Sequence, residues 1–169
     1  MNEVTNGQRL RDAAQALHED ILRSGVEQPS CPVRNLFAPG MWLREMTIPS
    51  GVVVVGAVHK HEHMAILSQG TIRLSTEQGV QEFTAPATIH SFPGIKRICY
   101  AMPTVRRLGA VEWEEPLPAV ITTIHHNPTN TQDMDVLIPE TVDVQAADLM
   151  GGNRNVQAIN NAINKELLK

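Results

Sequence analysis

The apolar positions of this chain recur with two spacings, and the first is a helical spacing near the start. From Gly7 to Ser24, apolar residues return every three or four positions, as they do along one face of an α-helix. This face comprises Leu10, Ala13, Ala14, Leu17, Ile21 and Leu22. Gly25 comes next, and glycine commonly ends a helix. The pattern therefore predicts an amphipathic helix over residues 7–24.

The second spacing is the alternation of a β-sheet, and it fills the middle of the chain. Residues 27–40 are rich in proline and predict a linker, after which the first alternating run begins near Met41. Further short runs continue to His126, separated by turn residues at Gly70, 77–79, 85–86 and 93–94. Many short strands with a turn signal after each are typical of a β-sandwich or barrel. We therefore expect a mainly β fold.

One run, residues 52–58, is apolar on both of its faces. Burying one aliphatic side chain contributes about 1.5–3 kcal/mol relative to leaving it exposed. Both faces should therefore be covered, one by the barrel interior and the other by a helix or a neighbouring subunit. The N-terminal helix is the nearest candidate.

The helical spacing returns at the end of the chain. The apolar positions are Val156, Ile159, Ala162, Ile163 and Leu167. They predict a terminal helix whose apolar stripe is narrow, so that alone it would be marginal. It packs on the barrel, on its own copy or on another protein. The expected organisation is an N-terminal helix and linker over 1–30, a β-barrel over 31–128 and a C-terminal extension over 129–169.

Composition excludes some classes of partner. The 14 basic and 18 acidic residues give a net charge of −4, and the basic residues are scattered, which argues against binding of nucleic acid. No apolar stretch approaches the roughly 18 residues that span a membrane, and the first residues lack the apolar core of a secretion signal. We expect an intracellular protein in which Cys31 and Cys99 stay reduced, with Cys99 in the core.

Three of the seven histidines crowd into the stretch HKHEH at 59–63. In an extended strand His59, His61 and His63 point to one side, and Glu62 points to the other. Neutral imidazoles that converge from one face suit a divalent metal such as zinc, iron, nickel or manganese. The alternative is a partly solvated strand end, where the histidines hydrogen-bond to their neighbours and hold no ion.

The surrounding segment resembles a cupin. From Gly51 to Ala101 the chain has a strand ending in alternating histidines, a bend, a strand ending in glycine, a hairpin, and a return strand after a Pro-Gly turn. A looser resemblance extends from Met41 to His126. It implies a single small antiparallel jelly-roll barrel, here with an N-terminal helix and a C-terminal helix.

The first cupin motif is matched only in part. Cupins carry two histidines, then a glutamate, then a glycine. When that glycine is anchored on Gly70, His59 takes the place of the second histidine, Ala57 that of the first, and His63 that of the glutamate.

The second motif departs further, because Arg97 stands where the resemblance implies the last metal-binding histidine. A guanidinium stays protonated and does not ligate a cation. Two substitutes are available: His61 swings in beside its neighbours, or His125 enters from another strand, in which case His126 faces away. A third ligand candidate, His90, precedes the Pro-Gly turn, and strand parity does not decide its direction.

Arg97 also supports a different function for the barrel, the binding of an anion. Its fork of donors beside several histidines suits a carboxylate or phosphate, so the barrel could bind a small anion through Arg97 and histidines. The plain alternative is that Arg97 faces outward and pairs with a surface acid.

Three phrases of the sequence are similar to a small cupin-like family of tailed bacteriophages. They are HKHEH with the following IL.QG, the stretch TAPAT to YA, and TTIH.NPTNT; residues 106–115 depart from that family and predict a divergent loop. The resemblance implies a binding or structural module, a virion component in the host cytoplasm, and a homo-oligomer or other virion proteins as partners. A metal-dependent dioxygenase or isomerase acting on a small molecule, with Glu62 as base, and a non-catalytic anion binder are the alternatives.

Overall fold

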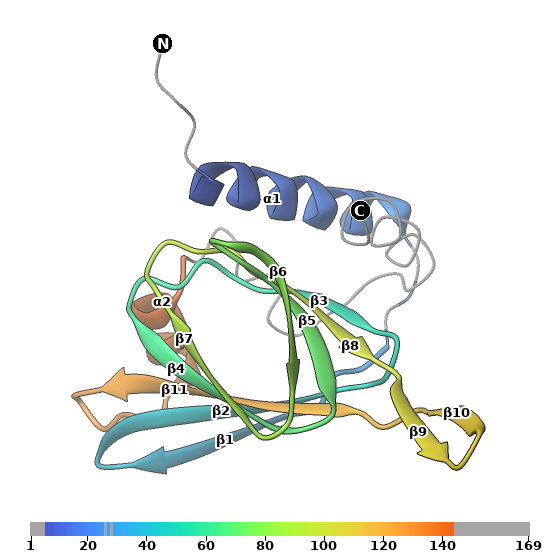
Figure 1. Cartoon of the computed structure of the whole chain (residues 1–169). Coiled ribbons are helices and arrows are strands. Elements are labelled where there is room, and N and C mark those ends of the chain that lie inside the picture. Colours follow the sequence, from blue (N-terminus) through green and yellow to red (C-terminus); the bar gives the residue numbers. More distant parts are fainter. Residues whose placement is uncertain (1–5, 26, 28, 144–169) are drawn as a thin grey trace.

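The computed structural model describes residues 6–25, 27 and 29–143 of the chain (Figure 1). Its elements, in order, are α1 (Asn6–Ser24), β1 (Val33–Ala38), β2 (Gly40–Ile48), β3 (Val53–Val55), β4 (His63–Gln69), β5 (Thr71–Thr76), β6 (Gly79–Thr84), β7 (Ala87–Ser91), β8 (Ile98–Met102), β9 (Thr104–Leu108), β10 (Val111–Glu115), β11 (Ala119–Asn127) and α2 (Met134–Thr141). The terminal helix predicted around 156–167 lies outside the described residues. No helix in the described ranges is both long and apolar enough to cross a membrane.

The strands form two main sheets that enclose the core. One sheet has the order β1-β2-β11-β4-β7 and the other the order β3-β8-β5-β6, with antiparallel pairing throughout. Both sheets contribute to the apolar interior, which includes Ile48, Leu67, Ile72, Ile89 and Ala101. The predicted fold class, a mainly β antiparallel jelly-roll barrel with a helix towards each end, is confirmed.

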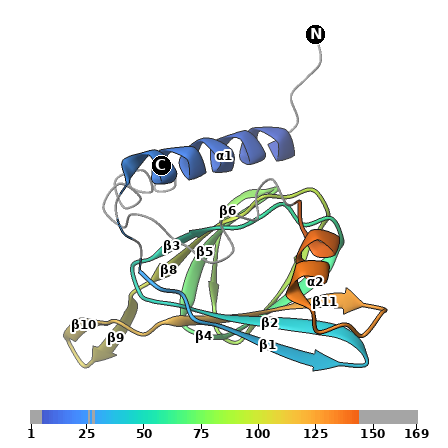
Figure 2. The same ribbon diagram turned by 180° about the vertical axis from the view of Figure 1, so that it is seen from behind.

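The N-terminal helix is confirmed and covers the apolar run, as expected. Ala14 and Ile21 of α1 pack against Val53, Val55 and Ile98 in one buried cluster. Both views show α1 lying along one side of the barrel (Figures 1 and 2). The outer face of β3 is therefore covered by the helix, which excludes water from aliphatic side chains on that side.

The linker predicted over 27–40 is wrong in its second half. Residues 33–38 form β1, which pairs with β2 in a hairpin that turns at Pro39 and Gly40. The prolines that suggested a linker, Pro32 and Pro39, flank the strand instead of interrupting it, so neither removes a hydrogen bond from its interior.

The loop predicted over 106–115 is also wrong. β9 and β10 pair antiparallel as a two-stranded hairpin, and Gly109 at its turn has a φ of +61°. The hairpin projects from the barrel in both views (Figures 1 and 2). The alternation of apolar and polar residues that predicts a strand is weak here. Charged residues lie on both faces of the hairpin, among apolar residues such as Val105 and Trp113.

The second helix, α2, closes one end of the barrel near the histidine stretch. Asp133 caps its N-terminus by accepting a hydrogen bond from the backbone N–H of Asp135. Beyond its last turn, Val142 forms a β-bridge with His59, and the Lys60 N–H donates to the Thr141 carbonyl over 2.9 Å. These bonds hold the loop before β4 against the end of α2.

Candidate metal centre

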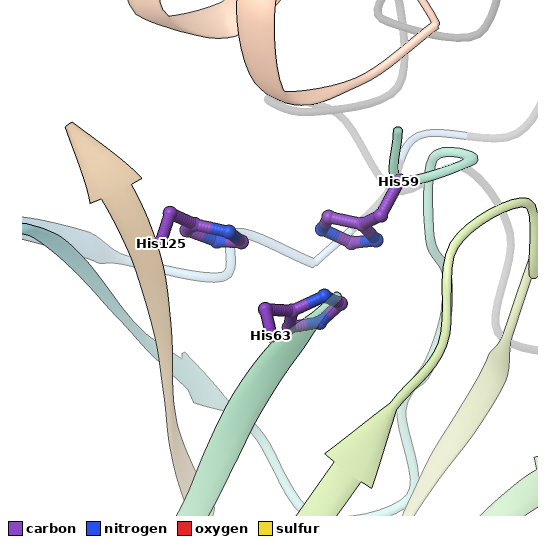
Figure 3. A group of neighbouring side chains, drawn as sticks. All are labelled: His59, His63 and His125. Carbon is purple, nitrogen blue, oxygen red and sulfur yellow. The ribbon is translucent and has the colours of Figure 1, made fainter. Parts of the chain in front are cut away.

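Three histidines from distant parts of the chain converge at one end of the barrel. Their rings point toward one another, and one ligand nitrogen from each lies within 4.8 Å of the others (Figure 3). His59 comes from the loop between β3 and β4, His63 is the first residue of β4, and His125 lies in β11. This group of three can hold a metal ion.

Strand alternation orients two of the three. In β11 the side chains of Ile121, Thr123 and His125 border the barrel cavity, whereas His126 is exposed on the opposite face, as predicted. In β4, successive residues from His63 onward alternate between buried and exposed, and His63 is the first of the buried residues. Both rings are thereby directed inward by the pleat of the sheet.

His59 lies outside the strands of the two sheets, so its position is fixed by contacts of its backbone. Its carbonyl accepts from the Gly94 N–H over 2.8 Å, and its bridge partner is Val142. The ring then packs against the other two, with centroids 4.1 Å from His63 and 5.3 Å from His125. The His63 and His125 centroids are 5.0 Å apart.

The surroundings keep these rings neutral. Burial lowers the pKa of His59 to about 2, and the neighbouring rings His63 and His125 add to the shift. Burial likewise lowers the pKa of His125 to about 3 and shifts that of His63 downward. A metal binds imidazole through the lone pair of the neutral form. The rings are therefore in the protonation state that ligation requires.

Hydrogen bonds leave one nitrogen available on His63 and on His125. The Nδ1–H of His63 donates to the His61 carbonyl over 3.3 Å, which leaves Nε2 as the nitrogen with a free lone pair. His125 Nε2 lies 2.9 Å from the Thr123 hydroxyl, which leaves its Nδ1. Metal-binding histidines are commonly oriented by such a bond at the second nitrogen.

The donor set fits a divalent first-row ion. With Zn–N bonds of 2.0–2.1 Å, tetrahedral ligands stand about 3.4 Å apart, so the three rings need only a small inward movement from their separation of up to 4.8 Å. Three protein ligands leave a fourth coordination position for water or a bound molecule, as in catalytic zinc sites. The residues present therefore suit a metal with an open coordination position.

The histidines line a cavity of about 140 Å³ inside the barrel. Its apolar walls are formed by Trp42, Met46, Ile48, Val54, Val55, Ala57, Ala65, Leu74, Ile89, Cys99, Ile121 and Val142. Two arginines, Arg44 and Arg97, also border it, and the described lining includes no aspartate or glutamate. The cavity is thus apolar with a positive bias.

His61 does not join the group. The prediction of three histidines on one strand is wrong, because β4 begins only at His63 and residues 60–62 form an exposed turn outside the barrel. Strand alternation does not extend to a bend, so the His61 ring stays at the surface. Of the two substitutes considered for the missing cupin ligand, the structure brings in His125.

Glu62 and His90 lie on the outside of the barrel. Both side chains are exposed, and the His90 Nε2 pairs with the Glu62 carboxylate there. His90 faces outward because its neighbours Ile89 and Ser91 take the two inward positions of β7. Neither residue reaches the cavity from this position, which corrects their expected place at the ligand site.

Arg97 borders the cavity and also has protein partners. Its guanidinium donates to the Ser75 carbonyl over 2.9 Å and to the His90 carbonyl over 3.3 Å. Its Nη2 lies 3.7 Å from the Glu77 carboxylate. Arg97 thus borders the cavity and does not face outward as the alternative held, although it does lie beside an acid, Glu77.

Arg44 and Trp42 were missed by the sequence analysis. Both lie on the inward side of β2 together with Met46 and Ile48. The signal was available, since these four residues alternate at a spacing of two. An arginine on an otherwise apolar strand face is a departure that marks a site candidate.

The chain was also compared with known proteins. No family model matches the sequence, and no curated protein is significantly similar to it. Solved structures similar to this chain include a cupin 2 domain-containing protein from Halorhodospira halophila, with a TM-score of 0.46, 14% identity, and coverage of 71% of this chain and 80% of that one. KdgF from a Halomonas species has a TM-score of 0.46 and 13% identity over 64% of this chain and 86% of its own. An RmlC-like cupin with a double-stranded β-helix fold from Methanocaldococcus jannaschii has a TM-score of 0.43 and 9% identity over 59% and 83%. These scores carry no inference about the site, whose chemistry rests on its side chains.

Proposed function

We propose that this chain is a cupin-type binding module that holds a divalent first-row metal ion on His59, His63 and His125. The observation that carries the proposal is the convergence of three neutral imidazoles, within 4.8 Å of one another, at an apolar cavity. When bound, the ion would supply a Lewis-acidic position facing the cavity. The protein's own contribution is to exclude water and to hold the rings.

A binding role is favoured over a dioxygenase or isomerase role by the lack of a proton-transfer group. Catalysis of those kinds needs an acid or base beside the reacting atoms. Among the described residues that line the cavity there is no carboxylate, and Glu62, the base considered from sequence, is exposed and paired with His90.

The experiment is a metal titration of three matched variants. Purified protein is stripped with EDTA, and binding of Zn²⁺, Ni²⁺ and Mn²⁺ is measured by calorimetry and elemental analysis. His63→Ala and His125→Ala should each lose stoichiometric binding, whereas His61→Ala, which removes an exposed ring of the same stretch, should bind like the parent. Absence of a stoichiometric ion in the parent, or equal loss in His61→Ala, would sink the proposal.

The biological setting remains a proposal that rests on the phage-like phrases of the sequence. It comprises a virion component, made in the host cytoplasm, that forms a homo-oligomer or contacts other virion proteins. Size-exclusion chromatography with light scattering, on the full chain and on a chain ending at residue 143, tests the self-contact. An unchanged monomeric mass in both would count against a homo-oligomer.

A further inference from the structure

Lys96 is a buried charged residue that the proposed metal site does not use. Its side chain is 1% exposed, and its Nζ donates to the Gln15 Oε1 over 2.6 Å and lies 3.1 Å from the His18 Nδ1. Both partners belong to α1, whereas Lys96 lies in the loop between β7 and β8. Lysine is almost never fully buried unless it is paired, because its ammonium group loses hydration. The contact with α1 is therefore a specific polar link, since an aliphatic side chain would fill the same space without that loss.

A second polar contact joins α1 to the same loop. The guanidinium of Arg11 donates to the carbonyl of Gly94, which also lies between β7 and β8. Arg11, Gln15 and His18 are spaced by four and three positions, so they lie along one stripe of the helix. That stripe adjoins the apolar residues with which α1 packs on β3. The helix therefore contacts the barrel through an apolar stripe and the loop through a polar one.

Gly94 also holds the first of the three histidines. Its N–H donates to the His59 carbonyl over 2.8 Å, while its own carbonyl accepts from Arg11. Two successive hydrogen bonds thus connect α1 with the backbone of a candidate metal ligand. His63 and His125 are placed by β4 and β11, so this connection concerns His59.

The second backbone contact of His59 also leads to the surroundings of Lys96. His59 forms its β-bridge with Val142, and Asp143 comes next in the chain. Burial lowers the pKa of Lys96, whereas Glu19 and then Asp143 act in the opposite direction and favour its charged form. The negative charges that act on Lys96 thus come from α1 and from the segment after α2.

We infer that Arg11 and Lys96 are positioning residues through which α1 sets the place of His59 in the proposed metal centre. When α1 leaves the barrel, Gly94 and Lys96 lose their hydrogen bonds to the helix, and the loop that holds the His59 carbonyl can shift. When a metal fixes the His59 ring, the same contacts favour the docked helix. By linkage, docking of α1 and occupancy of the metal site strengthen each other by the same factor. This inference names the element that regulates the proposed site and rests on that proposed function.

The test removes each contact and measures two properties. Arg11→Met and Lys96→Met delete the charged group and keep an unbranched side chain. Arg9→Met is the matched control, because Arg9 is an exposed arginine of the same helix. The first property is the exchange rate of the Gly94 amide in EDTA, followed by NMR, which reports the bond to the His59 carbonyl without any metal. The second is the affinity for Zn²⁺, from competition with a chromophoric chelator.

We expect Arg11→Met and Lys96→Met each to speed exchange at the Gly94 amide and to weaken Zn²⁺ binding by about fivefold or more, the lower end of typical coupling between sites. Arg9→Met should match the parent in both properties. The amides of β5 measure global unfolding and should keep their rates, which separates a shifted loop from a protein that is merely less stable. In the parent, Zn²⁺ should slow exchange in α1 and leave the amides of the β9–β10 hairpin unchanged.

The outcomes separate this inference from the proposed metal site. Exchange at Gly94 that stays at the parental rate in both variants, or that rises only as much as exchange in β5, overturns the positioning role whether or not a metal binds. Stoichiometric Zn²⁺ binding of unchanged affinity in both variants also overturns it and leaves the metal site standing. Faster exchange at Gly94 in a protein that takes up no Zn²⁺ overturns the metal site and supports the link between α1 and His59.

Discussion

His59 and His125 lie nearly parallel, with ring centroids 5.3 Å apart and ring planes inclined by 10°. One ring comes from the loop before β4 and the other from the last strand of the barrel. Two imidazoles so close and so buried cannot both take up a proton without repulsion and loss of hydration. The pair therefore makes the folded state sensitive to acid.

Acidification of the metal-free protein should destabilise it below about pH 6.5. The folded-state pKa values, about 2 for His59 and about 3 for His125, lie below the ordinary value of 6.5. Between those values the unfolded chain binds more protons, so the stabilisation is complete above pH 6.5 and is lost as pH falls toward the folded values. From pH 7.5 to pH 5.0 we expect a loss of about 2–4 kcal/mol, since one pKa unit corresponds to about 1.4 kcal/mol per ring.

The measurement is urea unfolding in EDTA at the two pH values. A His59→Gln, His125→Gln double variant serves as the control and should lose much less stability over the same range. Equal unfolding free energies for the parent at pH 7.5 and pH 5.0 would contradict the prediction.

Gly70, between β4 and β5, should tolerate no side chain. Its φ is +82°, and a Cβ placed there would lie 2.9 Å from both the Ala119 Cα and the Pro118 carbonyl oxygen, which are backbone atoms that do not yield easily. We expect Gly70→Ala to cost about 2–4 kcal/mol, from the strained φ together with the steric overlap. Gly79→Ala is the matched control, because Gly79 also has a positive φ, +107°, but nothing lies within 4 Å of the added carbon. Chemical denaturation of both variants isolates the steric part, and equal losses would refute it.

The side-chain directions that could be predicted from the sequence are those that the alternation of a β-strand determines. Residues such as His63, His125 and His126 belong to regular strands, and their directions follow from alternation. Residues 59–62 belong to a bend, where parity does not apply, so the placement of His61 and Glu62 could not be obtained in that way. The position of His59 depends on Val142 and Gly94, which are far along the chain. Only tertiary structure brings these segments together.

Arg44 shows a different limit. Its inward direction followed from the alternation of β2, but its proximity to the histidines depends on β11 pairing between β2 and β4. That strand order joins the beginning and the end of the barrel, and no local pattern encodes it. The family resemblance drew attention to Arg97 instead, because it compares motif positions and β2 lies before the motif.

Docking of α1 should depend on the small size of Ala14. This residue is fully buried against Val53 and Val55 of β3, whereas Ala13 beside it is exposed. Ala14→Leu should therefore destabilise the protein by about 1–3 kcal/mol through overpacking. Ala13→Leu, the same change one position away, should stay within about 0.5 kcal/mol of the parent. Thermal unfolding compares the two, and an Ala14→Leu variant as stable as Ala13→Leu would show that α1 does not pack on β3 as described.

Asp133 should govern how firmly α2 holds the loop that carries His59. Its carboxylate accepts from the Asp135 N–H over 3.0 Å at the start of a helix of only eight residues, which also contains Pro139. Loss of such a cap costs about 0.5–2 kcal/mol. The last residue of α2 is Thr141, and its carbonyl accepts a hydrogen bond from the Lys60 N–H.

Asp133→Ala should therefore speed hydrogen exchange both in α2 and at the Lys60 amide, because local opening of the helix releases the loop. Asp133→Asn, which keeps a capping oxygen, should exchange at the parental rate. If the α2 amides of Asp133→Ala exchange faster while the Lys60 amide stays protected, α2 does not hold the His59 loop, and the loop owes its place to Gly94 instead.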